Sequence, residues 1–203
     1  MKKIMIPLIL LLFAINIYTL MRLYRIKKNA THLYGTLTEN QELNFYKINF
    51  STSLNNDGVR LENVLLQDSL GKKQSLQSIF NKGQKQILVC RFSEFHCESC
   101  VDFSIQLLLS TNVFLGKNNL LFLGSYQNNR IFNREKELFG INQFSTYNTP
   151  TLNISLEEIG YPYFFILEEN LTISNIIIPD KNMPTLTQKY IEVIGNRYFN
   201  NHK

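Results

Sequence analysis

The sequence predicts a mixed α/β domain, in which a central sheet of parallel and antiparallel strands is flanked by helices, with a transmembrane helix at its N-terminus. Three observations predict this class. Apolar runs of strand length alternate with amphipathic segments from residue 63 onward. The last two apolar runs are separated only by a turn, which indicates an antiparallel pair. Residues 4–24 are almost entirely apolar and are long enough to cross a bilayer as a helix.

The N-terminal segment, residues 1–28, is expected to be an uncleaved single-span membrane anchor. A signal peptide would have a shorter apolar stretch followed by a small-x-small cleavage site, whereas residues 22–28 are largely basic. No cysteine follows the apolar run, so a lipid-modified N-terminus is not expected. Residues 29–56 are polar and mixed. We interpret them as a linker with an edge strand or hairpin, ahead of a domain at residues 57–203.

The first half of the domain supplies two expected strands and two expected helices. Residues 64–67 form a short apolar strand, and the turn at 68–71 leads to a short helix at 75–80. Residues 86–92 form a continuous apolar run, typical of a strand buried on both faces. Residues 97–110 place apolar side chains at helical spacing, which predicts a helix with one buried face.

The second half repeats the alternation and then changes it. An apolar strand is expected at 120–124, and a helix with a charged face at 131–139 is ended by Gly140. Residues 163–167 and 172–178 form the antiparallel hairpin, and an amphipathic helix at 183–198 closes the chain. This order predicts a mixed sheet with helices on both faces.

Cys97-Glu98-Ser99-Cys100 carries the clearest chemical signal, because it lies between the buried strand at 86–92 and the start of a helix. Unpaired N–H groups at a helix N-terminus stabilise a thiolate, and the spacing allows the second thiol to form a disulfide with the first. The motif therefore predicts redox chemistry. Cys90, in the middle of the apolar strand, is expected to be an ordinary core residue.

These residues resemble the thioredoxin-like superfamily, and within it the membrane-anchored TlpA-like, redoxin-type thiol-disulfide oxidoreductases. The resemblance covers residues 57–199. It depends on the apolar strand that ends at Phe92, on Cys97-x-x-Cys100, and on Gly160-Tyr161-Pro162-Tyr163 before the final hairpin.

The resemblance implies a role for each of these residues. Cys97 would be the exposed nucleophile and Cys100 the more buried resolving thiol, which releases the mixed disulfide on Cys97. Pro162 would be a cis-proline beside the pair, exposing the backbone of Tyr161 to an extended substrate peptide. Thr149-Pro150 is the rival cis-proline, but the polar stretch after it is a poor central strand.

The motif also departs from the family pattern. His96 stands where the family usually has Trp, and the interior of the pair is Glu-Ser. Glu98 should raise the pKa of Cys97, whereas a protonated His96 would lower it. His96 is therefore a second candidate for substrate contact, beside Tyr161. The direction of electron flow stays open on these grounds.

Other chemistries fit the residues less well. A peroxiredoxin needs Thr or Ser three positions before its reactive cysteine, where this chain has Glu94. Structural zinc needs four ligands, and only His96 and Cys90 are near the pair. A copper metallochaperone, a non-catalytic binding module and a structural disulfide remain alternatives. No metal and no cofactor is expected.

Charge and redox chemistry together predict where the protein acts. The net charge of +5 comes from residues 1–28, which have six basic and no acidic side chains; the remainder has 15 basic and 16 acidic ones. No basic face for nucleic acid is therefore expected. Basic residues after the anchor favour a cytoplasmic C-terminus, but the Lys2-Lys3 head resembles an export signal and a Cys-x-x-Cys domain suits the oxidising side.

We therefore expect a single-pass protein of the cytoplasmic (inner) membrane, held by residues 4–24, with its redox domain on the extracytoplasmic, periplasmic side. Its expected partners are protein thiol and disulfide substrates, together with a membrane or soluble thiol protein that donates electrons. The expected activity is thiol-disulfide exchange, mainly in the reducing direction that tethered TlpA-like proteins use.

Overall fold

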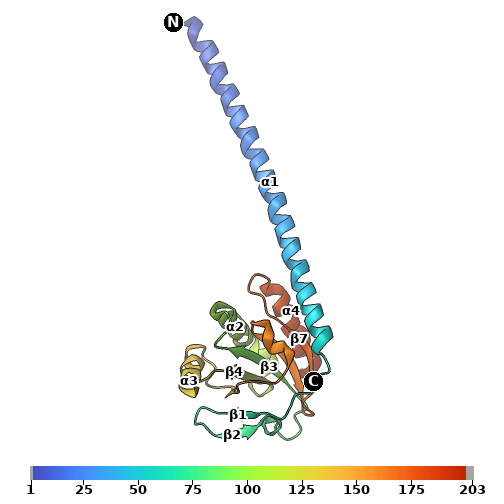
Figure 1. Ribbon diagram of the computed structural model, residues 1–203. Helices are drawn as coiled ribbons and strands as arrows, with labels where there is room; N and C mark the ends of the chain where they lie inside the picture. The colour runs from blue at the N-terminus through green and yellow to red at the C-terminus, as the bar shows by residue number, and fades with distance from the viewer. Residues whose placement is uncertain (1, 200–203) are drawn as a thin grey trace. The chain divides into compact units, whose positions relative to one another are not determined.

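The computed structural model describes residues 2–199, without the side chains of residues 2–12, 14, 31–34, 36, 38 and 112–114 (Figure 1). The chain divides into two compact units, Met1–Asn44 and Phe45–Lys203. Each unit is described by itself below.

The first unit is helical. Its residues belong to α1 (Lys2–Asn56), a single helix of 55 residues. The expected anchor at 4–24 lies in this helix. The side chains of its residues 4–12 and 14 are outside the described part. Apolar side chains from residue 13 onward are exposed, as Phe13, Leu20 and Tyr24 illustrate. Within the described residues, no helix is long and apolar enough to cross a membrane.

The expected edge strand or hairpin within 29–56 is wrong, because α1 continues to Asn56. The end of α1 belongs to the second unit and packs on it. Phe45 is buried in the core, and the Asn49 side chain pairs with the backbone of Ile178, accepting from its N–H at 2.6 Å and donating to its carbonyl at 3.4 Å. The face of α1 that packs on the domain is largely polar, so residues 45–56 lack the apolar pattern by which a helix is predicted from sequence.

The second unit is built on one seven-stranded sheet, ordered β2-β1-β5-β4-β3-β6-β7. The strands are β1 (Leu65–Gln67), β2 (Lys73–Ser75), β3 (Gln86–Ser93), β4 (Leu120–Ser125), β5 (Ser145–Asn148), β6 (Tyr163–Glu168) and β7 (Ile173–Ile177). The β3/β4 and β4/β5 pairs are parallel, and the other pairs are antiparallel. The mixed sheet and the final antiparallel hairpin are thus confirmed. The short strands β2 and β5 were not expected, because their sequences are polar.

Besides the end of α1, the helices of this unit are α2 (Glu98–Leu115), α3 (Asn129–Leu138) and α4 (Pro184–Ile194), and a π-helical turn follows α4 at Gly195–Phe199. Three short 3₁₀ helices complete the unit: η1 (Leu76–Ile79), η2 (Lys117–Asn119) and η3 (Ser155–Ile159). All three α-helices contribute to the same hydrophobic cluster on one face of the sheet. The other face is covered by the 3₁₀ helices η1 and η3 and the segments beside them, so helices flank both faces of the sheet. In Figure 1, α2 and α4 lie on one side of the sheet and the β1/β2 pair is farthest from them.

Strand β3 is the centre of both hydrophobic clusters. Leu88, Cys90 and Phe92 face the α-helices, while Ile87 and Val89 face the opposite cluster. This alternation confirms that the apolar run is buried on both faces. Cys90 is a buried core residue, as expected, and burial raises the pKa of its thiol. Because β3 and β4 are parallel, their carboxyl ends meet at one edge of the sheet, and the cysteine motif follows β3 at that edge.

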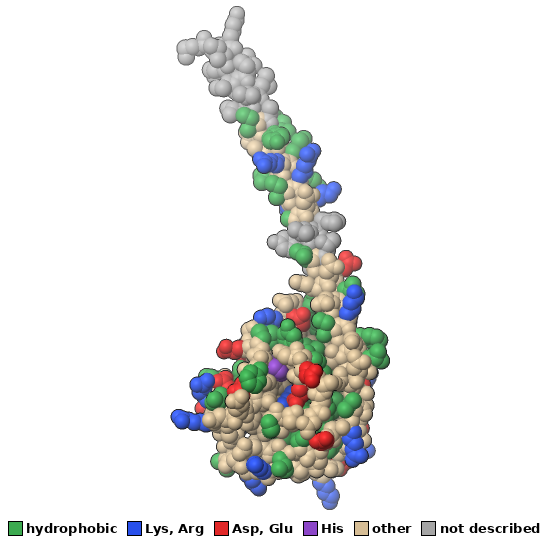
Figure 2. Space-filling view, in the orientation of Figure 1, with side chains coloured by type: hydrophobic (Ala, Val, Ile, Leu, Met, Phe, Trp, Pro, Cys, Tyr) green, Lys and Arg blue, Asp and Glu red, His purple; other side chains and the backbone are tan. Residues whose placement is uncertain are grey.

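The surface of the second unit has charges of both signs. On the face shown in Figure 2, acidic and basic side chains are interspersed among hydrophobic ones.

Candidate functional site

A tight turn leads from the end of β3 to the cysteine motif. The His96 N–H donates to the carbonyl of Ser93 at 3.0 Å, and the Phe95 N–H donates to the Ser93 hydroxyl at 3.2 Å. Glu94 fixes the turn to the end of β4, since its carboxylate accepts from the Gln127 N–H at 2.8 Å. Glu94 is thus a half-buried structural carboxylate. The turn delivers Cys97 to the position just before α2.

Cys97 lies just before α2 and Cys100 lies in its first turn, and the two thiols differ in exposure. The Cys97 carbonyl accepts the first helical hydrogen bonds, from the N–H groups of Cys100 at 2.9 Å and Val101 at 3.0 Å. Both cysteines are free; Cys97 is exposed and Cys100 is half-buried. An exposed thiol at a helix start with a second thiol behind it has the geometry required for attack and resolution.

The two thiols differ in acidity as well. Hydrogen bonds from the Cys100 thiol, the Ser99 hydroxyl and the Cys100 backbone N–H lower the pKa of Cys97 to about 7, and the charge of Lys181 adds to this effect. Burial raises the pKa of Cys100, and its interaction with Cys97 raises it further. Near pH 7 a large fraction of Cys97 is therefore thiolate, and Cys97 is the thiol suited to nucleophilic attack.

His96 does not supply the positive charge that the sequence suggested. The side chain is half-buried, and burial, followed by the charge of Arg91, lowers its pKa to about 4 against the opposing effect of Glu157. Its Nδ1 atom is buried without a hydrogen-bond partner. His96 is consequently neutral at pH 7, and the nearby positive charge comes instead from Lys181. Glu98 is exposed and is not among the causes of the Cys97 shift.

Ser99 and Lys181 are the residues that the sequence did not single out for function. The Ser99 Oγ lies 3.3 Å from the Cys97 Sγ, and the Lys181 Nζ donates to the same Oγ at 2.7 Å. Ser99 could have been found, since it is inside the motif. Lys181 is 82 positions further along the chain, in the connection between β7 and α4, and nothing in the sequence marks it.

Tyr161 and Pro162 lie at the same edge of the sheet as the motif. Strand β6 runs antiparallel to β3 with Tyr163 opposite Arg91, so the two residues before β6 are beside the end of β3. Tyr161 is half exposed and Pro162 is buried. The expected cis peptide bond at Pro162 is wrong, since every peptide bond in the described residues is trans. Gly160 makes the turn instead, in the left-handed conformation with φ of +75°.

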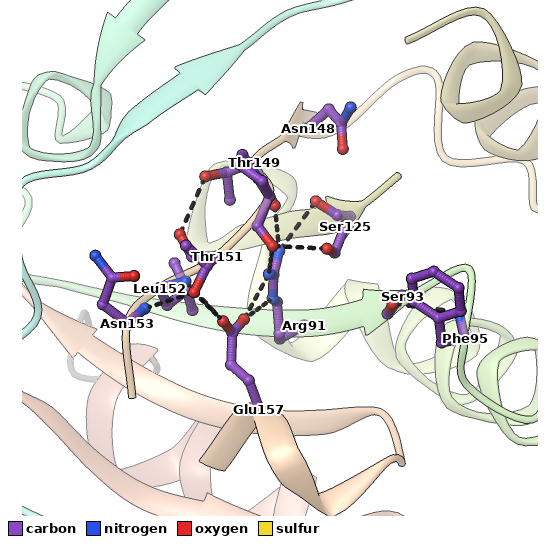
Figure 3. Close-up of polar contacts among 12 residues, drawn as sticks. Arg91, Ser93, Phe95, Ser125, Asn148, Thr149, Thr151, Leu152, Asn153 and Glu157 are labelled. Atoms are coloured by element: carbon purple, nitrogen blue, oxygen red, sulfur yellow. Dashed lines mark hydrogen bonds and ion pairs between the residues drawn. The ribbon is translucent and has the colours of Figure 1, made fainter. Parts of the chain in front are cut away.

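A buried ion pair fixes the segment that faces this edge. Arg91, in the middle of β3, is almost fully buried and contacts the Glu157 carboxylate with its Nε at 2.7 Å and its Nη2 at 2.5 Å. Its Nη1 donates to the carbonyls of Gly124 and Thr149, both at 3.0 Å. Figure 3 shows Arg91 and Glu157 pointing toward one another, with the Thr149 segment beside them.

The second carboxylate oxygen of Glu157 extends this network to the chain after Pro150. It accepts from the Thr151 hydroxyl at 2.6 Å and from the Leu152 N–H at 2.9 Å. Pro150, the alternative cis-proline candidate, follows Thr149 in this segment. Its carbonyl accepts from the Ser125 hydroxyl at 2.8 Å, which holds it in the same cluster. A pocket of about 280 Å³ lies between this segment and the turn that contains Phe95 and His96.

No metal centre emerges around the motif. In the part of the chain that the structure describes, no group of three or more His, Cys, Asp or Glu side chains could hold a metal ion.

The sheet order, with the motif at the junction of a central strand and a helix, defines a thioredoxin-like fold. The chain shares this fold with a protein of Aquifex aeolicus that has a proposed electron-transfer role, with a TM-score of 0.53 and 14% identity over 72% of this chain and 98% of the other.

Two further solved structures are similar. The thioredoxin domain of a thiol-disulfide oxidoreductase from Bacteroides vulgatus has a TM-score of 0.49 and 13% identity, over 66% of this chain and 97% of that domain. A peroxidoxin from Mycobacterium tuberculosis has a TM-score of 0.49 and 11% identity, over 70% and 97% of the two chains. In sequence, no family model and no curated protein matches the chain. The likeness to the Aquifex aeolicus protein thus supports the fold, and the activity has to be argued from the site.

Proposed function

We propose that this protein is a thiol-disulfide oxidoreductase that exchanges disulfides with protein substrates through Cys97 and Cys100. The observation that carries the proposal is the contrast between the two thiols. Cys97 is exposed with a pKa of about 7, whereas Cys100 is half-buried with a raised pKa. A structural disulfide would need no such difference, but a nucleophile and its resolving partner do.

The reaction proceeds in two exchanges. The Cys97 thiolate attacks one sulfur of the substrate disulfide, forms a mixed disulfide and releases the other substrate sulfur as a thiolate. Cys100 then loses its proton and attacks the Cys97 sulfur, which frees the second substrate thiolate and leaves a Cys97–Cys100 disulfide. Two electrons pass from the pair to the substrate, whose two thiolates take up protons from solvent or from Cys100.

Reduction of the substrate is the proposed direction. A pKa near 7 is typical of thioredoxin, a reductant, and lies far above the value of about 3.5 that accompanies the strongly oxidising DsbA. Continued turnover then requires a thiol protein, in the membrane or in solution, that reduces the Cys97–Cys100 disulfide again. Tyr161 and His96, at the edge of the sheet beside the motif, are proposed to contact the substrate.

The proposed location is the cytoplasmic membrane, with residues 4–24 as anchor and the redox domain outside the cytoplasm. Support for this part comes from the sequence, in which this segment is nearly uninterrupted by polar residues. The chemistry agrees, since disulfides form and persist on the oxidising side of that membrane.

The experiment that tests the activity uses the full chain purified in detergent. Reduced protein should accelerate the reduction of insulin disulfides by dithiothreitol, and Cys97→Ser should abolish the acceleration. Cys100→Ser should instead accumulate mixed disulfides with substrate proteins, because resolution is blocked. Cys90→Ser, which changes a buried thiol outside the motif, is the control for losses caused by misfolding. The proposed activity would be refuted if the wild-type protein did not reduce insulin and the Cys100→Ser variant formed no mixed disulfides.

A further inference from the structure

Lys181 reaches the cysteine motif from a connection that the fold holds in place. This residue lies between β7 and α4, where the Asp180 carboxylate accepts from the Asn182 N–H at 2.8 Å and the Asp180 carbonyl accepts from the Met183 N–H at 3.0 Å. Met183 is buried in the same hydrophobic cluster as Val101 of α2. The backbone at Lys181 is therefore fixed relative to the start of α2, although its side chain is in solvent.

The donors and acceptors of this contact determine where the Ser99 proton points. A lysine ammonium group can only donate, so the Ser99 Oγ accepts from Lys181 across the 2.7 Å contact. The hydroxyl retains one hydrogen of its own, and the Cys97 Sγ lies 3.3 Å away. A thiolate can only accept. The arrangement thus directs the Ser99 hydrogen to Cys97 and favours the ionised sulfur.

We propose that Lys181 is a positioning residue for the thiol chemistry, which acts through Ser99 to stabilise the Cys97 thiolate. The catalytic consequence rests on the proposed function, whereas the effect on the thiol can be measured without any substrate. Among the other groups, Cys100 also donates to Cys97, His96 is neutral, and the acidic residues adjacent in sequence, Glu98 and Asp180, are not among the causes of the Cys97 shift. The ordering of these influences agrees with the proposal, because Ser99 acts on the pKa of Cys97 more strongly than the direct charge of Lys181 does.

The test is the pH dependence of alkylation of Cys97 by iodoacetamide in the reduced full chain, followed by mass spectrometry of the peptide that contains it. The midpoint should lie near pH 7 in the wild type. Lys181→Met and Ser99→Ala should each raise the midpoint and slow alkylation at pH 6.5 by about threefold, the size of effect that exposed charged contacts produce. Lys181→Arg, which retains a charged donor, should restore most of the rate. Lys189→Met, which removes an exposed lysine that pairs with Glu192, is the matched control.

The double variant distinguishes an action through Ser99 from a direct effect of charge. If Lys181 acts mainly through Ser99, adding Lys181→Met to Ser99→Ala should raise the midpoint by clearly less than Lys181→Met does alone, the remainder being the weaker direct effect of the Lys181 charge. A midpoint unchanged in Lys181→Met, or a double variant that shows the sum of the two shifts, would overturn the inference. Insulin reduction is measured in parallel. A chain whose alkylation follows the expected pattern, but which neither reduces insulin nor forms mixed disulfides as its Cys100→Ser variant, would refute the proposed function and leave the role of Lys181 standing.

Discussion

At the scale of single residues, environment distinguishes side chains that the sequence presents as equivalent. The sequence identifies both thiols of the motif, yet only the structure shows how different their surroundings are. It also changes which neighbour matters. His96 and Glu98 flank Cys97 and were the expected influences, but His96 is neutral, and the charge that assists Cys97 belongs to Lys181. A contact across 82 residues leaves no local pattern to detect.

The neutral state of His96 predicts a pH-dependent stability. Burial, then Arg91, lowers the pKa of His96 to about 4 in the folded chain, against about 6.5 in the unfolded chain. Below pH 6.5 the unfolded state therefore binds a proton that the folded state does not, and stability is lost as the pH falls from 6.5 towards 4. Allowing for partial exposure, we expect His96 to account for about 1–2 kcal/mol of this loss.

Urea unfolding at pH 7.5 and pH 4.5 measures the effect. His96→Leu should lose less stability between the two pH values than the wild type, by the amount given above, since titration of the carboxylates is common to both proteins. Equal losses in both proteins would show that His96 has an ordinary pKa.

At the scale of elements, prediction from sequence succeeded where burial is apolar and failed where it is polar. The run at 86–92 is recognisable as a buried strand because five of its seven side chains enter the two hydrophobic clusters. The helix at the end of α1 was missed because Asn49 docks it by hydrogen bonds to a backbone rather than by an apolar stripe. The apolar run likewise does not mark Arg91 as half of a buried ion pair. Its partner, Glu157, is 66 residues away in η3.

The Arg91–Glu157 pair predicts a large loss of stability when its charge balance is broken. Arg91 is 2% exposed, so Glu157→Gln would leave a buried guanidinium without its counter-charge. Removal of one partner of a buried pair costs about 3 kcal/mol or more. The Pro150 segment would also loosen, since Glu157 accepts from Thr151 and Leu152.

Urea unfolding at pH 7.5 compares Glu157→Gln with a matched variant of a surface pair. Glu135 pairs with Arg134, whose side chain is 71% exposed, and Glu135→Gln should cost less than about 1 kcal/mol. A Glu157→Gln variant as stable as Glu135→Gln would mean that the buried pair contributes no more to stability than the surface pair does.

At the scale of the whole molecule, the domain places its reactive parts at one edge of the sheet and its packing elsewhere. The turn after β3, the residues before β6 and the connection after β7 all reach this edge, and they come from three separate regions of the chain. The order of the strands and helices with a clear apolar periodicity was predictable, whereas the polar strands β2 and β5 and the helical end of α1 were not. The precise neighbours of Cys97 were not, because they depend on how these three connections meet.

The proposed anchor leads to a prediction about the full chain, and the structure determines where the chain should be cut. Phe45 to Asn56 pack on the domain, so a truncation must leave this part of α1 in place. Deletion of residues 2–28 meets that condition and removes the apolar segment at 4–24.

The full chain should stay in the membrane pellet after carbonate extraction, because about twenty apolar residues suffice to span a bilayer. The truncated chain, with Met1 retained, should move to the soluble fraction with its insulin reductase activity intact. As a control, Cys97→Ser should stay in the membrane without activity. Recovery of the full chain in the carbonate supernatant would rule out the anchor. Orientation is tested by fusing alkaline phosphatase to the C-terminus, and an active fusion would place the domain outside the cytoplasm.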